Sequence, residues 1–146
     1  MPRIRSATPI DAPSILALER TALSAAHWSP AQYQEILSSS SRIVLVAEEN
    51  AFVQGFLVAR RGPEWEIENV VVAEAFRNQG LGSRLVAQVL DLARSHQAET
   101  VLLEVRESNT AARALYEKLH FKETGRRKAY YRGPEEDCIL YSMDWT

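Results

Sequence analysis

Apolar residues near the start of the chain recur at helical spacing. The stripe covers residues 15–23, and Asp11 ahead of it is suited to cap a helix. Ser29 followed by Pro30 predicts a second helix, because serine favours the N-cap and proline the first turn. Before both helices, residues 3–7 predict a short opening strand.

The middle of the chain changes to runs of β-branched and aromatic residues. Residues 43–47 and 52–59 predict a hairpin joined through residues 48–50, and residues 66–72 predict a buried strand. From Leu81 the period becomes helical again, which predicts a long amphipathic helix over about residues 80–95. Further elements follow in order: a strand over 100–105, a helix over 109–119, a strand near 121–125, a loop over 126–136 and a strand near 138–145. This order predicts a mixed α+β fold with a largely antiparallel sheet.

Length and composition bound the class of protein. At 146 residues, with 46% apolar and 25% charged residues, the chain is expected to form a single domain over residues 1–146. The formal charge of −2 favours neither nucleic acid nor an anionic membrane as a partner. No apolar run is long enough for a signal peptide or a membrane span, so we expect a cytoplasmic protein. Cys138 is the one cysteine, so no internal disulfide or metal-type Cys/His cluster is expected, and a buried thiol is favoured over a catalytic one.

The junction between the strand at 66–72 and the following helix carries the most informative motif. It reads Arg77-Asn78-Gln79-Gly80-Leu81-Gly82-Ser83, and it ends where the helical stripe begins. Glycines there let main-chain N–H groups approach a phosphate, and the helix N-terminus adds partial positive charge. A Walker loop is excluded because no Gly-Lys-Ser/Thr follows. A dinucleotide-binding fold is less favoured, since Leu85 stands where its third glycine would be.

The motifs resemble those of one acyltransferase superfamily. Arg77-x-x-Gly80-x-Gly82 after an apolar strand, with the blocks 103–112 and 114–121, is similar to the GCN5-related N-acetyltransferase (GNAT) superfamily. The segments at residues 28–29, 130–131 and 136–140 resemble the bacterial ribosomal-protein alanine N-acetyltransferase group. The resemblance implies a three-layer α/β/α fold with about seven mostly antiparallel strands and about four helices. It also implies acetyl-CoA as cofactor and no metal.

The resemblance assigns a cofactor role to two segments and one helix. Main-chain groups of the strand would pair with the pantetheine arm, and those of the turn would hold the pyrophosphate, with Arg77 or Arg84 assisting. Asn109 would contact the cofactor while capping its helix. The cofactor residues implied are Val70, Val71, Val72, Arg77, Asn78, Gln79, Gly80, Leu81, Gly82, Ser83, Asn109 and Tyr116.

Three residues are candidates for proton transfer. Glu104 alternates with apolar neighbours on its strand, and the resemblance places the proton acceptor there; otherwise it is a solvated or ion-paired residue. Glu68 is the alternative base, acting through water, at a position where the resembled group has an apolar residue. Tyr116 is the candidate acid, although its apolar neighbours also suit a core tyrosine. An α-amine costs only about 1 kcal/mol to deprotonate at neutral pH, against roughly 4–5 for lysine, so a modest base is enough.

The resemblance also implies a groove that receives a protein N-terminus. Tyr130, Tyr131 and Asp137 would form one side, or else belong to an ordinary surface loop, and Trp28 and Tyr33 would form the opposite wall. The leading function is acetyl-CoA-dependent acetylation of a protein or peptide N-terminus, with alanine and a ribosomal protein implied. A small-molecule amine acetyltransferase and a non-catalytic CoA-binding sensor are the alternatives. We expect a monomer or weak dimer, and the sequence does not identify the native substrate.

One residue departs from the resembled pattern at the end of the second motif. His120 stands where the family usually has glycine, at a helix end that often needs a positive φ. We therefore expect His120 to be a strained helix cap rather than a catalyst.

Overall fold

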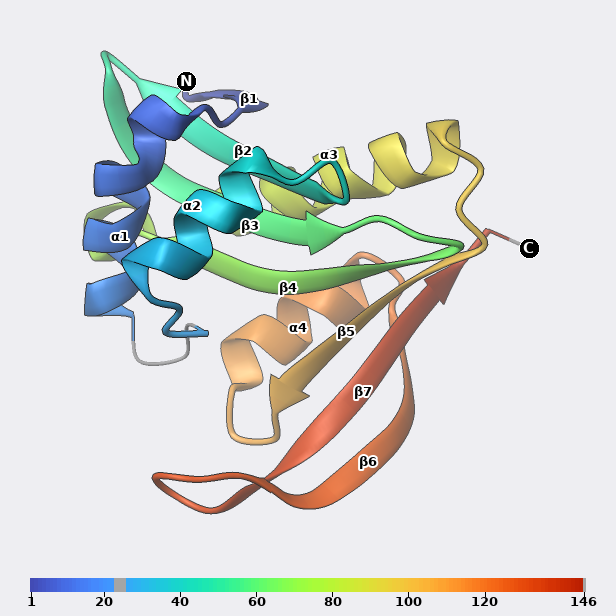
Figure 1. Cartoon of the computed structure of the whole chain (residues 1–146). Coiled ribbons are helices and arrows are strands. Elements are labelled where there is room, and N and C mark those ends of the chain that lie inside the picture. Colours follow the sequence, from blue (N-terminus) through green and yellow to red (C-terminus); the bar gives the residue numbers. More distant parts are fainter. Residues whose placement is uncertain (23–25, 146) are drawn as a thin grey trace.

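The computed structural model describes residues 1–22 and 26–145 and is built on one seven-stranded sheet (Figure 1). The strands are β1 (Arg3–Ser6), β2 (Arg42–Glu49), β3 (Phe52–Arg60), β4 (Glu64–Val72), β5 (Thr100–Arg106), β6 (Lys122–Tyr131) and β7 (Glu136–Asp144). The α-helices are α1 (Ala12–Thr21), α2 (Pro30–Ser38), α3 (Leu81–Ser95) and α4 (Thr110–Lys118), with 3₁₀ turns η1 (Pro9–Asp11) and η2 (Glu74–Phe76). The predicted α+β fold is confirmed.

The strand order is β1-β2-β3-β4-β5-β7-β6. Among the described residues β4 and β5 pair in parallel, and every other neighbouring pair is antiparallel. Asn50 and Ala51, with φ of 54° and 64°, turn the chain between β2 and β3. Two consecutive left-handed residues match the twist of a tight hairpin, so the strands extend further toward the turn than the sequence pattern indicates.

Each face of the sheet has its own apolar core, which completes the predicted three layers. α1 and α2 cover one face, where Ile15, Tyr33 and Phe56 are fully buried. α3 and α4 cover the other, where Leu85 and Val89 lie fully buried against the sheet. The helical stripes therefore face the sheet as their periodicity predicts. Leu23, which we expected at the end of the first stripe, lies outside the described residues.

The loop predicted over residues 126–136 is wrong for most of its length. β6 continues to Tyr131, and only residues 132–135 connect it to β7. β6 is the outer strand of the sheet, so most of its residues are exposed and show no apolar alternation. Register shifts interrupt its pairing with β7, which weakens the strand signal further. The resulting β6–β7 hairpin projects beyond the helical layers (Figure 1).

Within the described residues, every helix is too short or too polar to span a lipid bilayer. The backbone at His120 has a φ of 74°, which confirms the expected positive φ after α4.

Candidate active site

The sheet opens where β4 and β5 diverge. They pair only between Glu64–Ile67 and Thr100–Leu103, although β4 continues beside β3 and β5 beside β7 (Figure 1). In the described part of the chain, no ladder pair joins the two strands beyond that point. Their inward-facing main-chain groups are therefore available to hydrogen-bond a bound molecule in the manner of an added strand.

A β-bulge in β4 lies at the start of this opening. Val58 pairs with Asn69 and Ala59 with Ile67, so Glu68 is an extra residue on the β4 side. Ile67 packs on the α3 face, whereas Val71 packs on the α1–α2 face. The bulge thus reverses which face the odd-numbered residues occupy and turns Val70 and Val72 toward α3.

The glycine motif forms an uncapped helix N-terminus beside the opening. Gly80 has a φ of 80°, and α3 starts after it without a side-chain cap. Arg84 N–H makes the first helical bond, to the Gly80 carbonyl, so the preceding N–H groups have no acceptor inside the helix. A Cβ added at Gly80 would meet nothing within 4 Å, whereas one at Gly82 would come within 3.0 Å of Leu115 Cδ1. Gly80 leaves an open cradle suited to an anion, and Gly82 permits close packing of α3 against α4.

The two arginines of the motif differ in direction. Arg77 Nε donates to the Val72 carbonyl at 3.1 Å, which holds its exposed guanidinium over the end of β4. Arg84 instead donates to the Pro2 carbonyl at 2.9 Å. The geometry favours Arg77 as the assisting cation. Asn109 caps α4 as predicted, accepting from Ala112 N–H at 3.2 Å.

Glu104 lies on β5 just beyond the last pair with β4. Leu103 and Val105 pack in the core on the α3 face, so alternation turns Glu104 toward the α1–α2 face. Its carboxylate accepts a hydrogen bond from the Cys138 thiol, a weak donor, at 3.5 Å, and Arg127 lies 3.9 Å away. The carboxylate is thus partly buried but weakly engaged, which suits a proton acceptor. Its role as base stays a prediction.

Tyr116 approaches the opening from α4, on the other face of the sheet. It is 8% exposed and packs edge-on against Phe121, with Tyr141 close by. Burial raises the pKa of Tyr116 to about 12, so its hydroxyl stays protonated at neutral pH. Among the described residues, nothing hydrogen-bonds that hydroxyl. Tyr116 is therefore a free donor, as expected of a candidate acid.

Glu68, the alternative base, is already engaged. Arg42 donates to both of its oxygens, at 2.6 and 3.3 Å, and the carboxylate is largely buried. A carboxylate held by a guanidinium is a poorer proton acceptor than one without such a partner. Neighbouring Glu66 pairs with Arg60, and burial raises its pKa. The geometry favours Glu104 over Glu68.

Two of the predicted substrate residues gather near Glu104. The Tyr131 hydroxyl lies 3.9 Å from Cys138 Sγ, the atom that also contacts Glu104. The Glu104 charge is the first cause that raises the pKa of Tyr130, whose ring meets that of Tyr131 edge-on. Cys138 is buried, as expected, between these groups. The two tyrosines and the glutamate therefore face one space.

Asp137 has a structural engagement instead. Its carboxylate pairs with Arg126 at 2.8 Å and accepts from Ala129 N–H at 2.9 Å, and both contacts stabilise the hairpin. These contacts keep its pKa below the usual range, with the Ala129 N–H bond as first cause. A free acidic group for substrate binding is not what this geometry provides.

The expectation that Tyr33 lines the groove needs correction. Its side chain is 0% exposed, and its hydroxyl donates to Glu19 Oε1 at 2.8 Å while accepting from Asn69 Nδ2 at 3.0 Å. Trp28 is partly exposed and packs edge-on against the Tyr33 ring. Tyr33 therefore supports the wall from behind, and Trp28 provides the surface.

Sequence reasoning missed the residues that hold these walls. Glu19 is 2% exposed and also accepts from Trp28 N–H at 2.8 Å. Its place four residues after Ile15 in an apolar stripe was the signal of a buried carboxylate. Arg106 lies 4.5 Å from the centre of the Tyr131 ring and donates to the carbonyls of Arg132 and Pro134. No local pattern marks that contact.

A sheet that opens at β4–β5, beside an uncapped helix N-terminus, is suited to bind an extended molecule that carries a phosphate group. Residues 12–121 match the Acetyltransferase (GNAT) family, and this chain belongs to that family. It is therefore an N-acetyltransferase, and acetyl-CoA is its cosubstrate.

Three relatives illustrate the likeness. The N-alpha-acetyltransferase RimI of Mycobacterium tuberculosis is 34% identical over 122 residues, covering 80% of this chain and 75% of that protein. The ribosomal-protein-S18-alanine N-acetyltransferase structure from Escherichia coli superposes with a TM-score of 0.89 at 28% identity, covering 99% of this chain and 94% of that one. A putative streptothricin acetyltransferase structure from Bacillus anthracis, in complex with acetyl-CoA, gives 0.71 at 26% identity, covering 78% and 68%.

The residues around the opening fit acetyl-CoA. Unpaired main-chain groups of β4 suit an extended amide-containing arm, and the N–H groups after Gly80 suit a pyrophosphate. The positive φ at Gly80 and at Asn78 shapes this turn without a bulky residue in the way. The individual contacts of residues 70–72 and 77–83 stay predictions.

Proposed function

We propose that this enzyme acetylates the α-amino group of a protein N-terminus, with alanine as the first residue. The observation that carries the proposal is the weakly engaged Glu104 carboxylate at the opening, facing the same space as Tyr131. The relatives named for N-alpha and S18-alanine acetylation support the same substrate class, including a ribosomal protein.

The choice of an α-amine follows from free energy. Deprotonating an α-amino group with a pKa of about 8 costs about 1 kcal/mol at pH 7, whereas a lysine costs roughly 4–5 kcal/mol. A single carboxylate without a histidine partner is adequate for the first and poor for the second. Glu104 accepts the amine proton, directly or through one water, as the nitrogen forms its bond to the acyl carbon.

Tyr116 acts at the other end of the reaction, where the carbon–sulfur bond of the bound acetyl-CoA breaks. Its pKa of about 12 lies well above the value near 8.5 of an ordinary thiol, so full proton transfer to the thiolate would be uphill by about 5 kcal/mol. Tyr116 therefore works mainly by hydrogen-bonding the sulfur as negative charge develops, and solvent completes the protonation. Glu104 and Tyr116 lie on opposite faces of the sheet, so the reacting atoms sit in the opening between them.

The test supplies acetyl-CoA and an alanine-initiated peptide containing one internal lysine. We expect mass spectrometry to find the acetyl group on the α-nitrogen alone and none on the lysine. A matched peptide with a blocked N-terminus is expected to remain unmodified. Faster turnover of aminoglycoside-like or amino-acid amines than of the peptide would establish a small-molecule enzyme instead. Acetyl-CoA binding without turnover of any amine would establish a sensor.

A further inference from the structure

A hollow lies between α2 and the sheet, on the face that Glu104 also occupies. Its volume is about 240 Å³, and the reaction proposed above does not use it. The lining residues are Trp28, Gln32, Glu35, Ile36, Ser39, Arg42 and Glu68. The hollow therefore has an indole wall, an apolar base and three charged groups.

The charges of the hollow do not balance. Arg42 and Glu68 neutralise each other through their paired contacts. Glu35 is exposed on α2, and in the described part of the chain no ion pair or hydrogen bond engages its carboxylate. One negative charge is therefore left over at the rim, beside an indole ring that can bind a cation through its face.

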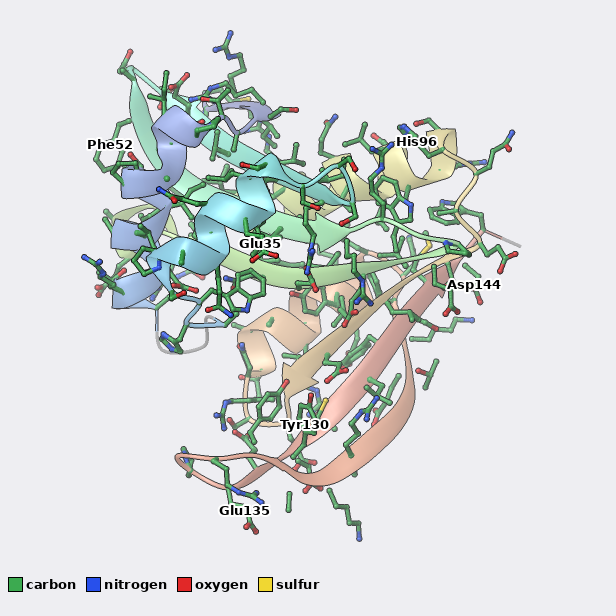
Figure 2. The ribbon with its side chains drawn as sticks, in the orientation of Figure 1. Glu35, Phe52, His96, Tyr130, Glu135 and Asp144 are labelled. Carbon is green, nitrogen blue, oxygen red and sulfur yellow. The ribbon has the colours of Figure 1, made fainter. Side chains whose placement is uncertain are left out.

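The hollow is close to the place where the acceptor would lie. Burial raises the pKa of Glu66 on β4, and the nearby charges of Glu68 and Glu104 raise it further. Glu68 directly follows Ile67 and Glu104 directly follows Leu103, the last residues at which β4 and β5 pair, so both carboxylates lie at the start of the opening. In Figure 2, Glu35 and Tyr130 lie on either side of the opening between β4 and β5. An extended peptide advances about 3.3 Å per residue, so a peptide whose first nitrogen lies at the opening would bring its second or third side chain to the hollow.

We propose that this hollow is a subsite for a basic side chain, arginine or lysine, at the second or third position of the acceptor polypeptide. The aliphatic stem would pack on Trp28 and the cation would pair with Glu35 at the rim. An acidic side chain would add a third carboxylate where the one guanidinium is already held by Glu68. This subsite rests on the proposed function, because it requires a polypeptide acceptor.

The test compares alanine-initiated peptides that carry arginine, lysine, norleucine or glutamate at position two, and a second set varied at position three. Norleucine keeps the stem and removes the charge. We expect arginine or lysine to raise kcat/KM about 10-fold over norleucine at one of the two positions, through KM, and glutamate to lower it. The preference should weaken at high salt.

Two substitutions locate the effect. Glu35→Gln is expected to reduce the preference for the basic side chain severalfold while leaving turnover of the norleucine peptide unchanged. Glu99→Gln is the matched control, since Glu99 is exposed before β5, at the end where β4 and β5 remain paired. Equal kcat/KM for all four side chains at both positions would overturn the subsite and leave the proposed function standing. Absence of turnover of every peptide would overturn both.

Discussion

Replacing Tyr116 by phenylalanine removes one oxygen and should separate stability from catalysis. In the described residues the hydroxyl has no hydrogen-bond partner, so folding loses no intramolecular bond. The rest of the ring keeps its contacts with Phe121 and Tyr141. We expect the free energy of unfolding to change by less than about 1 kcal/mol, or to rise slightly.

Catalysis should respond in the opposite way. A preorganised donor to a developing anion is worth about 10²–10³ in kcat, or roughly 2.7–4 kcal/mol. We expect kcat of Tyr116→Phe to fall by that factor with little change in KM for the peptide. Steady-state kinetics and urea denaturation on the same preparations provide the two measurements.

Tyr141→Phe is the matched control. Tyr141 is 1% exposed, and its hydroxyl donates to Glu117 at 2.6 Å and accepts from Arg113 Nε at 3.1 Å. This variant should lose about 1–2 kcal/mol of stability and keep its turnover. Unchanged kcat in Tyr116→Phe, or an equal loss in both variants, would refute the assignment of Tyr116 to the leaving sulfur.

Two further predictions concern the turn at Gly80 and the ion pair between Arg5 and Asp11. Gly80→Ala should cost about 1–2 kcal/mol of stability because φ is 80°, and it should raise KM for acetyl-CoA. Gly133→Ala is the control: its φ is 61°, and a Cβ there also meets nothing within 4 Å. It should cost the same stability and leave KM for acetyl-CoA unchanged. The hydrogen bonds from Arg5 lower the pKa of Asp11 in the folded protein. Ionised Asp11 therefore stabilises the fold fully at pH values above its unfolded pKa of about 3.9. That stabilisation is lost as the pH falls through the pKa of Asp11 in the folded protein. Urea titrations between pH 2 and 6 should therefore show that the free energy of unfolding falls less steeply with decreasing pH in Asp11→Asn than in the parent. The same pH dependence in both proteins would contradict this prediction.

Elements with one buried face were predictable from the sequence. α3 is the clearest case, since Leu85, Val89 and Ala93 recur at helical spacing and all three are fully buried. β6 was not predictable over its full length, because an edge strand buries little and carries no alternation. The bulge at Glu68 was not predictable either, since Val70, Val71 and Val72 are all apolar and the sequence does not show that the side chains change face.

The site was predictable where motifs are local and unpredictable where contacts are distant. The turn around Gly80 leads from the strand into α3 where the motif predicts, and Asn109 caps α4 as expected. The partner of Glu68 is Arg42, 26 residues away, and no sequence periodicity connects the two. The sequence suggests that Tyr33 lines the groove, whereas its hydroxyl donates to the buried Glu19 carboxylate, a contact that no sequence pattern predicts.

The pH dependence of turnover in Glu104→Gln tests the central claim most directly. An alanine-initiated peptide and acetyl-CoA are supplied between pH 6 and 9, with Glu68→Gln measured alongside. We predict that Glu104→Gln lowers kcat by a factor of about 10²–10⁴. Glu68→Gln should keep the pH dependence of kcat seen in the parent. Full kcat in Glu104→Gln across this range would contradict the account.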